Sequence, residues 1–190
     1  MHAVSRVPLN KVLGVLVKVR SDRFLEQFDH VFGEYIEKAK TRYAPRIGLF
    51  FIKFSALEHT LDICLAERIS ERQHHSGYIV IEGMPLNARI ELFRKLFAGL
   101  VKGTHPRYAV KLKAIVKRLR AARTFRNYVA HANWSTLENT GYVRTRIDED
   151  DGEVIFKRVR ITPKVINAWI KRVVTLERDL DKFAEGAGHT

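Results

Sequence analysis

The chain has 190 residues and a mass of 22.0 kDa, which suits one domain or one domain with a small appendage. Hydrophobic residues make up 46% of it, so disorder along most of the length is excluded. Lys and Arg number 34 against 21 Asp and Glu, and the net charge of +13 predicts a polyanionic partner, with nucleic acid favoured over an anionic membrane surface.

The single cysteine, Cys64, excludes a disulfide-stapled fold within one chain and favours a reducing compartment. Neither C-x-x-C nor H-E-x-x-H occurs, so no zinc ribbon or zincin, and no metal or cofactor, is expected. The apolar run Val12–Val17 is too short for a signal peptide and far too short for a membrane span. Residues 1–22 are therefore predicted to form a short N-terminal element that packs on the body of a cytoplasmic protein with no membrane partner.

Helical spacing of apolar residues predicts the first elements of the chain. Pro45 and Gly48 mark a break between the first two helices, and Tyr78–Ile81 is too short to assign. The second helix is longer than average, which is typical of a helical bundle. The four predicted helices span about 23–40, 49–71, 85–102 and 108–131.

The apolar period changes from 3.6 to 2 after Trp134. Two alternating stretches flank Asp148–Gly152, an acidic turn that ends in glycine, which predicts a β-hairpin over about 142–161. Thr162 and Pro163 then predict the N-cap and first turn of a closing helix.

The closing helix is expected to end near Ala184, and residues 185–190 are expected to form a frayed tail. The predicted fold is mainly α: residues 23–184 form an up-and-down helical bundle with one β-hairpin inserted before the last helix.

One arginine interrupts the apolar stripe of the helix over 108–131. Steps of three and four residues from Leu112 place Arg126 on that stripe. A buried arginine is costly unless it is paired or opens to a cavity, so we expect Arg126 to lie largely buried beside a carboxylate or a bound anion. Glu58, which forms an acidic i, i+4 pair with Asp62, is a candidate partner. The alternative is that Arg126 is a paired core charge and His131 a helix-end cap.

The string Arg126-Asn127-x-x-x-His131 resembles the R-x(4–6)-H signature of the HEPN superfamily, in which a polar residue commonly follows the arginine. The flanking Phe125 and Trp134 are also similar to HEPN sequences. So is the order of elements, with the motif at the end of a late helix and a closing helix after it.

The resemblance implies an all-helical metal-independent endoribonuclease that works as a homodimer, and many HEPN proteins act in defence or as toxins with an antitoxin partner. By the motif match, Arg126 would contact the phosphate and His131 would transfer a proton. Asn127 would orient one of these two side chains. The chemistry agrees, because RNA carries its own 2′-hydroxyl nucleophile, histidine titrates near neutrality, and arginine can stabilise a phosphorane.

Arg126 and His131 lie about 140° apart around an ideal helix. Their side chains therefore meet only if the helix ends or distorts near Ala130, if the long arginine wraps back, or if a second chain completes the site.

Other cations are candidates for contact with RNA, single-stranded RNA above all. The predicted helix carries a basic flank, and Tyr142 alternates with two arginines of the hairpin on one face, which could hold a single strand. A solvated charged face and a partly buried edge tyrosine are the alternatives. The predicted RNA-binding residues are Arg123, Arg120, Lys117, Arg144 and Arg146.

Two other functions compete with a ribonuclease. A HEPN-like module that has lost activity could bind RNA or a regulatory protein. A basic adaptor could bind nucleic acid with no HEPN relation. Both ends of the motif are present, which favours catalysis over the first alternative.

Overall fold

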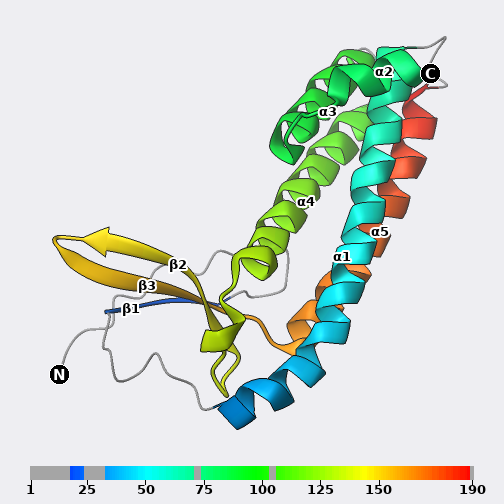
Figure 1. The fold of residues 1–190 in the computed structure, drawn as a ribbon. Helices are drawn as coiled ribbons and strands as arrows, with labels where there is room; N and C mark the ends of the chain where they lie inside the picture. Colours follow the sequence, from blue (N-terminus) through cyan, green and yellow to red (C-terminus); the bar gives the residue numbers. More distant parts are fainter. Residues whose placement is uncertain (1–17, 24–32, 71–73, 103–105, 189–190) are drawn as a thin grey trace. The chain divides into compact units, whose positions relative to one another are not determined.

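A computed structural model describes residues 18–23, 33–70, 74–102 and 106–188 (Figure 1). Within these ranges the chain forms five α-helices and one three-stranded sheet, and the helices hold more than half of the 190 residues, so the predicted mainly-α class is confirmed. The elements are β1 (Val19–Arg23), α1 (Gly33–Ile69), α2 (His74–Ile81), α3 (Leu86–Val101), α4 (Pro106–His131), β2 (Tyr142–Asp150), β3 (Glu153–Arg160) and α5 (Pro163–Gly188).

The chain packs into two compact units. Of the described residues, the sheet unit holds 18–23, 33–50 and 125–169, and the helical unit holds 51–70, 74–102, 106–124 and 170–188. The long helices α1, α4 and α5 are each divided between the units, with one segment in each unit.

The predicted hairpin is confirmed, and a strand from the N-terminal region joins it. The sheet has the order β1-β3-β2, and both pairings are antiparallel (Figure 1). The β2–β3 turn is the two-residue Asp151-Gly152, with φ of 55° and 77°. Left-handed values at both positions identify a type I′ turn, which matches the right-handed twist of the strands.

The expected break at Pro45 and Gly48 is wrong, because α1 runs through both residues. An interior proline removes one helical hydrogen bond and costs about 3 kcal/mol. Tyr43 and Phe50 flank Pro45 on one helix face, seven residues apart, and both are buried. Burial of two such side chains contributes about 1.5–3 kcal/mol each, which offsets the proline and keeps the helix continuous. Residues 24–32, which hold half of the predicted first helix, lie outside the described residues.

The other helix predictions agree with the structure to within a few residues. Thr162 caps α5, since its Oγ1 accepts a hydrogen bond from Val165 N at 3.3 Å. The helix continues to Gly188, beyond the predicted end, because Ala187 is still buried. The unassigned stretch before residue 81 belongs to the short helix α2.

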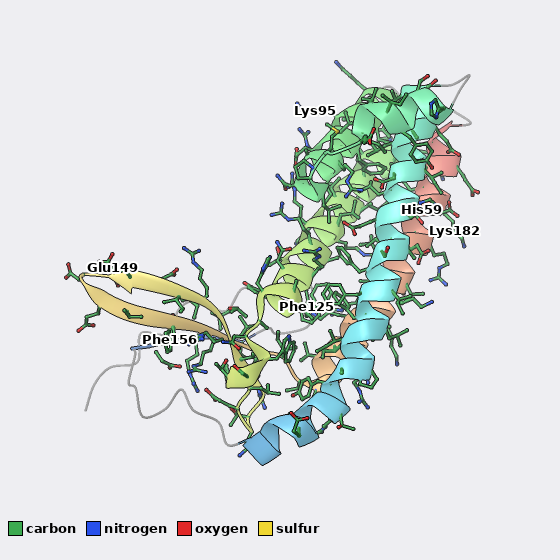
Figure 2. The ribbon with its side chains drawn as sticks, viewed as in Figure 1. His59, Lys95, Phe125, Glu149, Phe156 and Lys182 are labelled. Atoms are coloured by element: carbon green, nitrogen blue, oxygen red, sulfur yellow. The ribbon has the colours of Figure 1, made fainter. Side chains whose placement is uncertain are left out.

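Aromatic rings form the core of each unit. In the sheet unit, Phe125 stacks on Trp169 with ring centroids 4.7 Å apart and meets Phe50 edge-on at 5.2 Å. Figure 2 labels Phe125 on α4. In the helical unit, Phe97 of α3 and Phe183 of α5 lie 5.6 Å apart. None of the helices in the described ranges has the length and apolarity needed to cross a membrane.

Gly77 allows α2 to lie against α1 in the helical unit. A Cβ at this position would overlap the backbone of Ala66, whereas a Cβ on Gly99 of α3 would meet nothing within 4 Å. We therefore expect Gly77→Ala to lower the free energy of unfolding by about 1–3 kcal/mol through overpacking. Gly99→Ala is the matched control and should stabilise the chain by about 0.5–1 kcal/mol through helix propensity. Urea unfolding followed by circular dichroism measures both; equal effects would contradict the close packing.

Candidate functional site

The buried stripe of α4 passes through residue 125 rather than through residue 126, where it was expected. Phe125 is the buried residue between Ala122 and Val129, and Arg126 is half-buried rather than buried. Because 3.6 residues complete a turn, the stripe can pass through either position, and the aromatic ring takes the core place. Arg126 is therefore less buried than the stripe predicts for a core position, and it lies at the margin of the core.

Arg126 reaches toward the next residue of the motif. Its Nη1 lies 3.5 Å from Asn127 Oδ1, which places the guanidinium beside that amide. Asn127 and His131 are four residues apart and so share one face of α4. The Arg126 guanidinium thus lies beside Asn127, and the helix face of Asn127 also carries His131.

His131 is the last residue of α4 and is exposed. The end of the helix is fixed from the far side by Trp134, whose Nε1 donates to Val129 O at 3.2 Å. The Trp134 ring lies 5.6 Å from that of Tyr43 on α1. These contacts hold the final turn in place while leaving the imidazole open to solvent.

The sheet brings one predicted RNA-binding residue beside this helix end. Asn133 N donates to Arg144 O at 2.7 Å, which joins β2 to the chain two residues after His131. The Arg144 guanidinium carbon lies 4.8 Å from the ring centroid of Phe156, a cation–π distance (Figure 2 shows Phe156 on β3). The half-buried Arg144 is thus held at the base of the hairpin, near the end of α4.

A β-bulge separates Arg146 from this group. Arg144 pairs with Arg158 of β3, but Arg146 pairs with the adjacent Lys157, so the two arginines lie on opposite faces of the sheet. The expected alternation of Tyr142, Arg144 and Arg146 on one face is therefore wrong. Arg146 is exposed and forms an ion pair with Asp148.

The other predicted RNA-binding residues belong to the helical unit. Arg123 is half-buried, Arg120 pairs with Glu91 of α3, and Lys117 is exposed. Lys117 and Arg120 line a groove of about 680 Å³ between α3 and α4. Sequence reasoning missed the groove, although the spacing of basic residues on both helices is visible in the sequence.

Glu58, the partner suggested for Arg126, and Asp62 both lie beside Arg89. Arg89 of α3 donates to Asp62 at 2.6 Å and lies 3.5 Å from Glu58. No group of three or more histidine, cysteine or acidic side chains that could hold a metal ion occurs within the described ranges.

Arg158, a buried cation of β3, was not anticipated. It is 6% exposed and lies 3.3 Å from Asp22 and 3.7 Å from Glu138. Arg20 pairs with the same two carboxylates at 2.8 and 2.6 Å. Two arginines and two carboxylates thus form a neutral cluster at the junction of β1 and β3, which ties the N-terminal strand to the sheet.

The buried Cys64 should be chemically inert. Burial, with the neighbouring Glu67 and Asp181 carboxylates, raises the pKa of the thiol to about 12. Since the thiolate is the reactive form, we expect the native protein to resist a thiol reagent such as DTNB at mildly alkaline pH and to react at once in guanidinium chloride. The absorbance of the released thionitrobenzoate measures this, and rapid labelling of the native chain would contradict the burial.

Comparisons with known proteins find no relative of this chain. No family model matches it, and neither does any curated protein or solved structure.

Proposed function

We propose that this protein is a metal-independent endoribonuclease of HEPN type, with Arg126, Asn127 and His131 as its active site. The observation that carries the proposal is the approach of Arg126 to Asn127 on the helix face that ends in the exposed His131. A cation and an imidazole base at the end of one helix are the two kinds of group that RNA cleavage requires.

The proposed reaction uses the RNA's own 2′-hydroxyl. His131 accepts the proton of that hydroxyl as the oxygen attacks the adjacent phosphorus, and the bond from phosphorus to the 5′-oxygen breaks. Arg126 donates hydrogen bonds to the phosphate oxygens as negative charge builds on them. Asn127 holds the guanidinium. The products are a 2′,3′-cyclic phosphate and a 5′-hydroxyl.

A second copy of the chain completes this chemistry. The leaving 5′-oxygen needs a proton donor, and one motif offers a single histidine. In a two-fold dimer with the ends of both α4 helices facing each other, one His131 acts as base and the other as acid. The net charge of +13 draws the substrate to such a dimer by long-range attraction.

A second candidate function, RNA binding without cleavage, is favoured by the surface of α4 away from the motif. Lys113 and Lys117 are exposed and form no ion pair with any residue in the described part of the chain. Uncompensated lysines of this kind attract phosphates without contributing to a reaction.

The variant His131→Ala separates the two functions. With labelled single-stranded RNA and excess chelator, we expect the wild type to cut and this variant to lose about 10²–10⁴-fold in rate, because a proton-transfer group is gone. RNA binding should stay nearly unchanged. His59→Ala, which removes another exposed histidine, is the matched control and should cut normally (Figure 2).

Arg126→Ala should weaken both binding and cleavage, since its charge acts on the ground state and the transition state alike. Arg178→Ala, at an exposed position on α5, controls for loss of one positive charge. A thermal melt checks folding of each variant. A wild-type protein that binds RNA but cuts no single-stranded substrate would exclude the ribonuclease and leave the binding function.

The proposed dimer predicts a measurable mass. Sedimentation at micromolar protein should give about twice the chain mass of 22.0 kDa. Spin labels at residue 130, introduced as Ala130→Cys with Cys64→Ser, should lie close across the two-fold axis. A monomer, or distant labels in a dimer, would contradict a shared site.

A further inference from the structure

The groove between α3 and α4 lies wholly within the helical unit. Its floor is aliphatic and its rim is cationic. The floor is formed by Ala98, Val101, Ala109, Leu112 and Val116, and the rim by Arg94, Lys102, Lys113, Lys117 and Arg120. Among the residues that the structure describes, no acidic or aromatic side chain lines it.

The dimensions suit a docked helix. The walls run from Arg94 to Lys102 on α3 and from Ala109 to Arg120 on α4. At 1.5 Å per residue these segments are about 12 and 16 Å long, or two to three helical turns. Leu112 and Val116 are buried at the bottom, four residues apart, so they present one continuous apolar strip.

The charges of the rim are only partly compensated. Glu91 pairs with both Arg94 and Arg120, and these two guanidinium groups lower the pKa of the Glu91 carboxyl. Lys102, Lys113 and Lys117 form no ion pair with the residues that the structure describes. Three lysines around an apolar strip are complementary to a ligand that is apolar on one side and carries acidic groups on its flanks.

The side chains of the floor favour a protein ligand over RNA. Single-stranded RNA is held by rings that stack on its bases and by polar groups that read their edges. The floor offers neither, only aliphatic carbon. An amphipathic helix with leucine-like anchors at helical spacing fits such a floor, and its glutamates or aspartates reach the lysines.

We propose that this groove is a docking site for an acidic amphipathic helix of a partner protein. Its residues on α4 end at Arg120, before the motif begins at Arg126, and its occupation requires no cleavage activity.

The probe is a labelled synthetic peptide, stabilised as a helix, with leucines along one face and glutamates flanking them. Fluorescence anisotropy with the full chain should show saturable binding that weakens with salt. A peptide with the leucines replaced by serine should bind roughly tenfold more weakly or worse, because its apolar contact is lost while its charge is kept. Equal binding of the serine peptide would overturn the proposal.

The double variant Lys113→Glu/Lys117→Glu should bind the acidic peptide roughly tenfold more weakly or worse. It should bind a lysine-flanked version of the peptide more tightly than the wild type does. The matched control Lys95→Glu/Lys171→Glu makes the same change of charge at exposed positions outside the groove and should bind the acidic peptide nearly as the wild type does (Figure 2 labels Lys95 on α3).

Circular dichroism confirms that both double variants are folded. Equal loss in the two would mean that only net charge matters and would overturn the proposal. So would a uridine oligonucleotide that binds at Lys113 and Lys117 while the acidic peptide does not, since RNA would then be the occupant.

Discussion

The buried stripe of α4 determines where the candidate functional groups of this helix lie. Leu112, Ile115, Leu119, Phe125 and Val129 are buried along one side of the helix. Burial of each such side chain contributes about 1.5–3 kcal/mol, so the rotation of the helix about its axis is strongly fixed. The polar side chains of the same turns must then face outward or lie at the margin. Phe125 in particular fixes Arg126 at the edge of the core, where a guanidinium can remain hydrated and still reach its neighbour.

We propose different ligands for the two ends of α4. The last turn offers a cation, an amide and an imidazole, held by the Trp134 bond to Val129 and by the Asn133 bond to Arg144. The first half offers lysines around an aliphatic floor. The excess of positive charge is thus divided between a site suited to a phosphodiester and a groove suited to an acidic helix. Arg158, by contrast, is neutralised within the sheet unit and has a structural role.

Local signals in the sequence were strong enough to predict most of the elements. Asp151-Gly152 specifies its turn, and Thr162-Pro163 specifies the start of α5, because each depends on neighbouring backbone only. Pro45 led to the prediction of a helix break that the structure does not contain. Burial of Tyr43 and Phe50 outweighs the cost of a proline inside a helix. The apolar stripe predicted a core position for residue 126, whereas residue 125 takes it, because both positions satisfy the helical period. The bulge before Arg146, the pairing of β1 and the groove depend on contacts between distant segments, which periodicity does not encode.

The most direct measurement of the central claim uses an RNA strand with 2′-deoxy sugars at the positions where the all-ribose strand is cut, incubated with the wild-type protein in excess chelator. Attack by the 2′-hydroxyl predicts that the all-ribose strand yields a 2′,3′-cyclic phosphate and that the substituted positions are not cut, although the strand is still bound. Cleavage at the deoxy positions, or no cleavage of the all-ribose strand, would contradict the account.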